Sequence, residues 1–449
     1  MDETVSLFEQ VKELIEKKSF LTLKRILQNL NPADIAEIIH ELPQEERVVL
    51  FRLLKKDVAI EVFEFMEFEA QQEFLSTFPE AKVRELIEEM EPDDRTELFE
   101  ELPAKVTKRL LLLLSPEEKE ATAILLGYQE NSAGRMMTPK FMDLKENVTV
   151  SQALNRIRRI GLKKETSYYC YVIDEQRTLK GVVSLRDMVT ADPDEYISNI
   201  MFKEVISVNT DDDQEEVASI MQKYDFIALP VVDRENRLVG IVTVDDIVDV
   251  VQEEATEDIY KMGAVGVVEE GYFRSNVVSV ATRRMMWLLI LLGINTITSK
   301  VIAGYEKMLT SFVVLTAFMP LLIDSGGNIG SQSSTVVIRS LALKEIESRD
   351  ALWVVLRESF TGLILGTLMG AMAFLWSWWL VKDIAVAFTI GVSLVIISTL
   401  ATTTGTMLPF FFKAIKIDPA LTSSPFVTTV VDIVGIVVYL GVAAYVLLR

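Results

Sequence analysis

The chain has 449 residues, enough for several domains, and its charge is divided unevenly along its length. Residues 1–270 hold 57 Asp and Glu against 32 Lys and Arg, whereas residues 271–449 hold 9 against 13 and are rich in apolar residues. An acidic N-terminal part excludes nucleic acid as a partner, since that needs a basic surface, and is compatible with binding cations.

Cysteine and histidine are nearly absent. Cys170 and His40 are the only residues of their types, so no disulfide can form within the chain and a reducing compartment is expected. Zinc or copper sites built on thiolates and imidazoles are excluded, and so is Cys–His nucleophilic catalysis. No P-loop or nucleophile–base pair is evident, and we expect no enzyme. Any metal is expected to be a hard cation held by oxygen atoms, such as Mg²⁺.

Residues 1–130 predict an all-α, superhelical N-domain. Apolar residues recur at helical spacing between prolines, and the segment 32–43 aligns without gaps with 92–103, 60 residues further on. A proline at the start of each repeated helix is typical of stacked short helices. One face of this domain is acidic and carries Glu61, Glu88, Glu89, Glu91, Asp93, Asp94 and Glu97. Such a run is ordinarily a solvated face, and cation binding is the alternative.

Residues 131–252 contain a second repeat, in which 170–189 matches 229–248 at an offset of 59. Each copy is predicted to be strand, polar turn and strand, followed by Ser/Thr-x-x-Asp at the start of a helix. These sequences are Ser184 to Asp187 and Thr243 to Asp246. The α/β module resembles a tandem pair of CBS domains, which implies regulation and dimerisation. The hydroxyl, carboxylate and helix amides fit a nucleotide such as ATP, although N-capping alone also explains them.

Carboxylates are dense in the second copy and after it. Because like charges repel, divalent cations between domains would relieve this crowding. Residues 253–276 are predicted to form a connecting, plug-like helix with no flexible Gly/Ser linker, although Gly263, Gly266 and Gly271 soften its latter part. A stiff connector can transmit a movement.

Five apolar segments predict an α-helical transmembrane domain of five helices over 277–449. The segments are 285–304, 308–341, 351–381, 384–412 and 420–448. A multi-pass protein of the cell (inner) membrane is therefore expected. Placing the N-terminal domains in the cytoplasm and the C-terminus outside puts the larger number of Lys and Arg at inner loops, as the positive-inside rule requires.

Two of these segments contain polar residues that lipid disfavours. The second contains Pro320 and three glycines between 326 and 330, which predict an interrupted helix whose Asn328 and Gln332 line a pore or gate. Close packing of small residues explains the glycines but not the amides. The fourth segment has its own polar residues, Ser398 and the run 402–406, which are expected to face the same path.

Asp432 lies near the middle of the last segment. A carboxylate at that depth costs ~2.5–3.5 kcal/mol even on a lenient insertion scale, so it is expected to face protein or water. One interpretation is a structural role in helix packing, with Asp432 accepting hydrogen bonds from Thr428, from Thr429 or from a neighbouring helix. The interpretation we favour is a carboxylate that attracts a cation into a pore.

Together these features resemble the MgtE family of magnesium channels along the whole chain. The specific similarities lie in 254–260, 320–332, 417–420 and 425–435. The resemblance implies a homodimer in membrane lipid, with a pore formed between subunits by the second and fifth helices. It also implies that Mg²⁺ is both transported and regulatory: abundant cytosolic Mg²⁺ bridges the acidic domains and closes the pore, and scarcity opens it.

The resemblance further implies a set of metal ligands. In the pore, Asp432 would select hydrated Mg²⁺, with Thr428 and Ser424 one and two turns earlier, whereas Asp324 stands where relatives are often neutral. The cytoplasmic ligands that it implies are Glu61, Asp93, Glu97, Asp213, Glu215, Asp225, Asp246, Asp249, Glu254, Glu257, Asp258 and Asp418.

Two other functions compete with a channel. A coupled carrier would exchange Mg²⁺ or Co²⁺ for protons or Na⁺, and flux that follows the electrochemical gradient alone separates the two. A membrane-tethered nucleotide sensor that transports nothing would need neither Asp432 nor the polar second segment.

Overall fold

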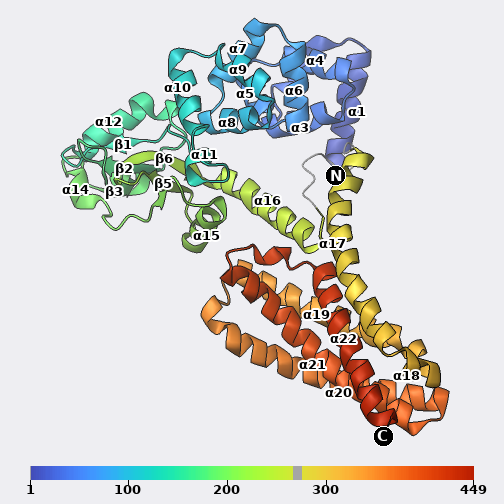
Figure 1. The fold of residues 1–449 in the computed structure, drawn as a ribbon. Coiled ribbons are helices and arrows are strands. Elements are labelled where there is room, and N and C mark those ends of the chain that lie inside the picture. The colour runs from blue at the N-terminus through green and yellow to red at the C-terminus, as the bar shows by residue number, and fades with distance from the viewer. Residues whose placement is uncertain (1, 266–275, 449) are drawn as a thin grey trace. The chain divides into compact units, whose positions relative to one another are not determined.

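The computed structural model describes residues 2–265 and 276–448, and the chain divides into two compact units, Met1–Gln252 and Glu253–Arg449. The first unit begins with short helices that share one hydrophobic core (Figure 1). They are α1 (Asp2–Glu16), α2 (Phe20–Leu27), α3 (Pro32–Glu41), α4 (Gln44–Leu53), α5 (Lys56–Glu64), α6 (Phe68–Thr77), α7 (Glu80–Glu89), α8 (Pro92–Glu101), α9 (Ala104–Leu111) and α10 (Pro116–Leu125).

Prolines keep these helices short. Leu42, Phe78 and Leu102 each follow a helix in an extended conformation, and each precedes a proline, which disfavours helical geometry in the residue before it. The chain therefore turns after two or three helical turns, and helices two apart in the chain pack together, as α3 does with α5 and α8 with α10. The predicted all-α N-domain is confirmed.

The rest of the first unit is the repeated α/β module. Its elements are α11 (Ala133–Met136), β1 (Asp143–Leu144), α12 (Val150–Ile160), β2 (Tyr169–Ile173), β3 (Leu179–Ser184), α13 (Leu185–Thr190), α14 (Ile197–Ile200), β4 (Val208–Asn209), α15 (Gln214–Tyr224), β5 (Ala228–Val232) and β6 (Leu238–Thr243). Each half has a three-stranded sheet with one parallel and one antiparallel pair, β1-β2-β3 and β4-β5-β6.

The two sheets repeat one another in detail. Val172 pairs with Gly181 in the first sheet, and Val231 pairs with Gly240 in the second, at the predicted offset. A register shift follows each of these valines. The α/β fold predicted for this module is confirmed.

Helix α16 (Val244–Met262) continues directly from β6. The connecting helix predicted over 253–276 is thus the end of a longer helix, and it stops earlier than expected, at Met262. Gly263 follows, and Ala264 adopts a positive φ of 56°, which ends helical geometry. Gly266 and Gly271 lie outside the described residues.

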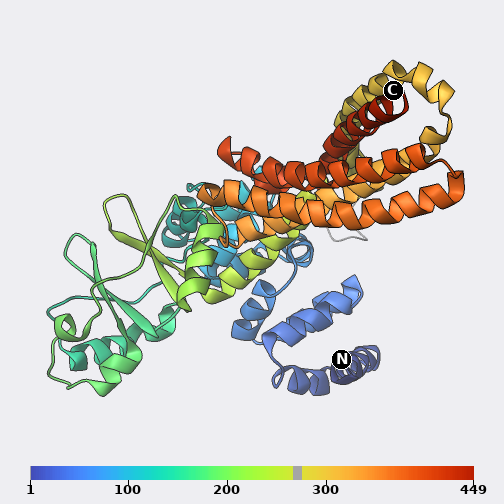
Figure 2. The ribbon, with the colours of Figure 1, turned by 90° about the horizontal axis from the view of Figure 1, so that it is seen from below.

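The second unit contains long helices (Figure 2). They are α17 (Val277–Gly304), α19 (Val314–Ala342), α20 (Ala351–Val381), α21 (Ile384–Ala414) and α22 (Ser424–Leu447), with the short helices α18 (Glu306–Ser311) and η3 (Pro419–Leu421) between them. Among the described residues, four helical segments are long and apolar enough to cross a membrane, and they contain α17, α20, α21 and α22. Helix α19 is long enough but more polar.

Glycines bring α20 and α21 together. Gly362, Gly366 and Gly370 repeat every four residues on the face of α20 that contacts α21. A Cβ atom at Gly370 would lie 2.6 Å from the carbonyl oxygen of Gly391 on α21. Two apolar helices therefore pack backbone against backbone.

The prediction that α19 is interrupted is wrong, because the helix runs unbroken through Pro320 and the glycines. The glycines instead allow α21 and α22 to pack closely against α19. Gly326 faces Ile397 and Val431, and Gly330 lies against the backbone of α21, where a Cβ atom on Gly405 would collide with the Gly330 carbonyl. Small residues here allow three helices to approach closely.

The structure does not support the expectation for the polar run of α21 at Thr402 and Thr403. Thr402 is buried and faces Gly362 of α20, and the Thr403 hydroxyl lies 2.7 Å from that of Ser359 on α20. These hydroxyls join two helices, and they do not share the exposed polar face of α19.

Candidate functional site

Asp432 lies on α22 where α19 comes closest. Gly327 of α19 faces it: a Cβ atom there would lie 2.7 Å from Thr428 Cγ2 and 3.5 Å from Asp432 Oδ1. The absence of a side chain at Gly327 therefore leaves the space that the Asp432 carboxylate and Thr428 occupy.

Hydroxyl groups continue from Asp432 along α22. Thr428 Oγ1 lies 3.1 Å from Ser331 Oγ of α19, and Ser424 Oγ donates to the same Ser331 Oγ at 3.0 Å. Ser331 thus links two hydroxyls that lie one and two turns before Asp432. An open hollow of about 530 Å³ adjoins them, lined by Asn328, Ser331, Gln332, Thr335 and Val336.

This hollow belongs to a polar face that follows the length of α19. Asp324, Asn328, Ser331 and Thr335 are spaced by four, three and four residues, which places them on one side of a helix. Asp324, Asn328 and Thr335 are exposed in the single chain. At membrane depth such a face must meet water or protein, because lipid cannot hydrogen-bond it.

The hydrogen-bonding interpretation of Asp432 is not supported. Thr429 donates to the carbonyl of Pro425, and Thr428 pairs with Ser331. Within the part of the chain that the structure describes, Asp432 Oδ1 is buried without a hydrogen-bond partner. An unsatisfied carboxylate oxygen needs a cation, a proton or water.

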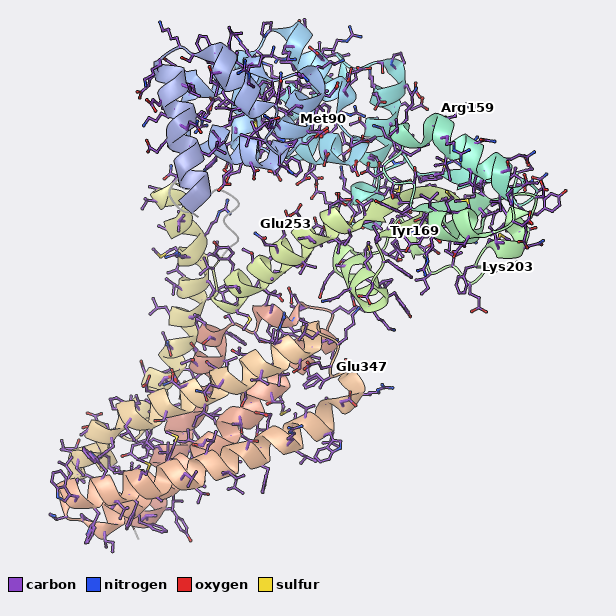
Figure 3. The ribbon with its side chains drawn as sticks, turned by 180° about the vertical axis from the view of Figure 1, so that it is seen from behind. Met90, Arg159, Tyr169, Lys203, Glu253 and Glu347 are labelled. Atoms are coloured by element: carbon purple, nitrogen blue, oxygen red, sulfur yellow. The ribbon has the colours of Figure 1, made fainter. Side chains whose placement is uncertain are left out.

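A second acidic site lies within the first unit, where α7, α8 and neighbouring N-domain residues meet the CBS module. We call it the acidic interface cluster: Glu64, Glu91, Asp93 and Asp94 from the N-domain, with Glu165, Asp245, Asp246 and Asp249 from the CBS module. Helix α8 packs against α10 and α11 beside it, and Met90, labelled in Figure 3, is buried next to Glu91.

Three carboxylates of this cluster converge. One oxygen each of Glu91, Asp93 and Glu165 lies within 4.8 Å of the others. Asp93 is 9% exposed, and its Oδ1, like Glu165 Oε2, is buried without a hydrogen-bond partner among the described residues. Lys140 Nζ lies 2.7 Å from Glu91 Oε2 and compensates only one charge. An all-oxygen set of this kind fits Mg²⁺.

The pKa values of several carboxyl groups in the acidic interface cluster are raised. Burial, with repulsion from Asp94, raises the pKa of Glu64 to about 8. Burial, with repulsion from Glu91, raises the pKa of Glu165 to about 7 and that of Asp94 to about 6. Burial also raises the pKa of Asp246 to about 7, and burial and Asp246 raise that of Asp93 well above its usual range. Ionised together, these groups favour separation or a bound cation.

The two Ser/Thr-x-x-Asp sequences have different surroundings. Ser184 Oγ donates to Asp187 Oδ2 at 2.6 Å and accepts from the Asp187 amide, and this pair is partly open to solvent. Thr243 Oγ1 donates to Asp246 Oδ2 at 2.7 Å, but Asp246 belongs to the acidic interface cluster. Only the first copy is therefore free for a solvent-borne ligand.

An apolar hollow of about 110 Å³ lies near the first copy. Its lining includes Tyr169, labelled in Figure 3, with Val182, Phe202 and Phe226. Val182 and Ser184 share one face of β3, because they are two residues apart on a strand. An aromatic base fits such a lining.

The structure brings some predicted ligands together and leaves others apart. Asp93, Asp246 and Asp249 meet in the acidic interface cluster. Glu61 and Glu97 are exposed on α5 and α8, and Asp213, Glu215 and Asp225 are exposed around α15, where Asp213 caps the helix. Glu254, Glu257 and Asp258 lie on α16 after Glu253, which Figure 3 labels, and Asp418 caps η3. The structure also brings Glu257 and Asp418 together, since both bind the ammonium group of Lys261.

Three acids were missed from the sequence. Glu64 and Glu165 belong to the acidic interface cluster, and Glu358 is half-buried in α20, where it accepts from Ser333 Oγ at 2.9 Å. Glu358 could have been found as a third acid inside an apolar segment, after Asp324 and Asp432. Nothing in the local sequence distinguishes Glu64 or Glu165 from surface acids.

Family models match most of the chain. A divalent cation transporter model, MgtE, matches residues 319–442; the MgtE intracellular N domain matches 30–131; and CBS domains match 133–194 and 197–253.

Curated relatives are similar along nearly the whole chain. The magnesium transporter MgtE of Thermus thermophilus is 40% identical over 437 residues, which cover 96% of this chain and 97% of the relative. The magnesium transporter MgtE of Bacillus subtilis is 34% identical over 424 residues, covering 94% and 93%.

Two solved structures resemble part of the chain. The cytosolic domain of the Mg²⁺ channel MgtE in complex with ATP has a TM-score of 0.52 and 42% identity, and covers 54% of this chain and 99% of its own. The soluble part of a magnesium transporter has a TM-score of 0.53 and 32% identity, covering 56% and 99%.

Proposed function

The chain belongs to the MgtE family of magnesium transporters, and on that premise we propose that it is a Mg²⁺ channel that cytosolic Mg²⁺ closes. The two relatives that cover nearly the whole chain are named as transporters and not as enzymes, as the sequence predicts. The observation that carries the proposal is Asp432 Oδ1, which is buried beside Gly327 in an apolar helix and has no hydrogen-bond partner among the described residues.

The pore is formed by a homodimer. The polar face of α19 is exposed in a single chain, and a second copy would cover it and face it with an identical polar stripe. Two Asp432 carboxylates then attract the ion, with Thr428 beside them. Because Mg²⁺ loses its waters reluctantly, the carboxylates attract the hydrated ion without stripping it. Asp324 adds a second charge on the same face.

Regulatory Mg²⁺ binds the acidic interface cluster. Glu91, Asp93 and Glu165 supply converging oxygens, and the bound charge offsets the repulsion of Asp94 and Asp246. Mg²⁺ thus favours the arrangement in which N-domain and CBS module are docked, and its loss favours separation. Further regulatory ligands are proposed at Glu61, Glu97, Asp213, Glu215, Asp225, Asp249, Glu254, Glu257, Asp258 and Asp418.

Helix α16 links the regulatory site to the membrane unit by chain continuity. Asp246 lies in its first turn, and Glu257 and Asp258 lie near its end. We place the N-terminal domains in the cytosol and the C-terminus outside. Exposed tryptophans at both ends of α20, Trp353 and Trp379, fit the two membrane interfaces and support this helix as a span.

Purified protein in liposomes is expected to conduct Mg²⁺ down its electrochemical gradient with no other ion gradient present. The membrane potential is clamped with K⁺ and valinomycin, and Mg²⁺ entry is followed with an internal dye. A channel reverses at the Mg²⁺ equilibrium potential. A coupled Mg²⁺ or Co²⁺ carrier reverses elsewhere and moves with a proton or Na⁺ gradient, and a tethered sensor shows no flux.

ATP is proposed as the ligand of the CBS hollow. Phe202 lines the hollow and is 60% exposed, so its replacement should not disturb the core. Because stacking on a base contributes ~1–3 kcal/mol, Phe202→Ala should weaken ATP binding by roughly 5- to 100-fold. Calorimetry on the full chain measures this. Tyr196→Ala, 52% exposed and outside the hollow's lining, is the matched control, and equal affinities in both variants would contradict the site.

A further inference from the structure

Lys261 joins two of the proposed metal ligands within the second unit. It lies in the last turn of α16, and its Nζ is 2.6 Å from Glu257 Oε1 and 2.7 Å from Asp418 Oδ2. Asp418 comes from the connection between α21 and α22, where its other oxygen accepts from the Ala420 amide at 2.8 Å. One ammonium group therefore fastens the end of α16 to the loop that precedes the Asp432 helix.

The side chains that form this contact are partly shielded from water. The side chain of Lys261 is 24% exposed, and those of Glu257 and Asp418 are 35% and 36% exposed. Burial alone would lower the pKa of Lys261, but hydrogen bonds from its ammonium to Asp418 and Glu257 outweigh it and raise the pKa above the usual value. The group therefore stays charged at neutral pH.

One ammonium does not neutralise its surroundings. Burial and repulsion from Asp418 raise the pKa of Asp258, which lies beside Glu257. Three carboxylates thus surround one ammonium, and the positive charge of Arg339 partly offsets the rise in the pKa of Asp258. The excess negative charge attracts a further cation, and the oxygens that bind Lys261 are the ones a divalent ion would use.

We infer that Lys261 is a positioning residue: an internal counter-cation that holds the end of α16 against the Asp418 loop when Mg²⁺ is absent and competes with Mg²⁺ for Glu257 and Asp418. This inference rests on the proposed function in taking these carboxylates as Mg²⁺ ligands. Without Lys261, attachment of α16 to this loop depends on a divalent ion, and that ion binds more tightly because a competing charge is gone.

Hydrogen exchange of the full chain in nanodiscs tests this, read by mass spectrometry at peptides covering 255–262 and 416–422. Wild type should be protected with EDTA and with Mg²⁺. Lys261→Met should exchange at least tenfold faster with EDTA and recover with Mg²⁺. Lys261→Arg should behave as wild type, since it restores the charge. Lys413→Met, an exposed lysine at the end of α21, is the matched control.

Two results overturn the inference. One is a Lys261→Met variant that stays protected in EDTA. The other is protection that is lost in EDTA and does not return with Mg²⁺, because that outcome indicates damage to packing. Asp418→Asn separates these cases: it should lose protection in EDTA and regain less with Mg²⁺, having lost a ligand. Unchanged exchange in α20 and α21 shows that each variant is folded. Absent Mg²⁺ flux in wild type would refute the proposed function without altering these exchange patterns.

Discussion

Replacement of Asp432 by asparagine is expected to lower Mg²⁺ flux by about a hundredfold, which corresponds to about 2.7 kcal/mol. At an effective dielectric constant of about 20, one unit charge 4 Å from another contributes ~4 kcal/mol, and Mg²⁺ carries two. Asparagine has nearly the same shape, and Oδ1 has no hydrogen bond to lose among the described residues. The variant should therefore fold while its ion attraction fails. Flux into liposomes at equal protein content measures the effect.

Glu347→Gln is the matched control for charge. This acid is exposed on the connection between α19 and α20, labelled in Figure 3, and its loss should leave flux unchanged. The assignment of α22 to the pore would be contradicted by Asp432→Asn protein that still conducts Mg²⁺ at the wild-type rate and with wild-type preference over K⁺.

The internal repeats made much of the fold predictable. An offset of 59 in the sequence reappears as the same strand pairing and the same register shift after Val172 and Val231. In the N-domain, prolines after Leu42 and Leu102 mark the helix ends. These features are local, so the sequence carries them without knowledge of distant contacts.

The continuity of α19 could not be predicted in the same way. A glycine inside a helix weakens it unless a neighbouring helix uses the space, and the neighbour of Gly330 is Gly405, far along the chain. The same holds for Thr402, whose partner surface is Gly362. Asp432 was identifiable because the cost of a buried charge depends only on depth in an apolar segment.

The sequence alone could not predict which acids form the acidic interface cluster. Asp34 and Asp94 occupy the same position in the two copies of the N-domain repeat. Asp34 is exposed, whereas burial and Glu91 raise the pKa of Asp94 to about 6. Only the packing against the CBS module distinguishes them, and packing also adds Glu165 to the site.

Asp93→Asn is expected to keep the N-domain docked on the CBS module without Mg²⁺. Asparagine resembles the protonated form of Asp93, which its burial already favours. In wild type, we expect Mg²⁺ to protect residues 1–270 from proteases and EDTA to expose them. In the variant, protection in EDTA should approach the level that Mg²⁺ gives wild type, and added Mg²⁺ should change little. Limited proteolysis of the full chain measures both, with Asp34→Asn as the control that behaves as wild type.

In wild type without Mg²⁺, low pH should keep the N-domain docked on the CBS module. The direction of this pH dependence follows from the pKa shifts. Burial raises the pKa of Glu64 to about 8 and those of Glu165 and Asp246 to about 7 in the docked state, whereas separated carboxyls have ordinary values. The docked state therefore binds more protons than the separated state. Protonation stabilises docking fully at a pH below the ordinary carboxyl pKa values, and this stabilisation is lost as pH rises through about 7 to 8. In EDTA, wild type should be more protected at pH 6 than at pH 8.5, whereas saturating Mg²⁺ should remove the difference. Equal cleavage at both pH values in EDTA would mean that repulsion within this cluster does not drive separation.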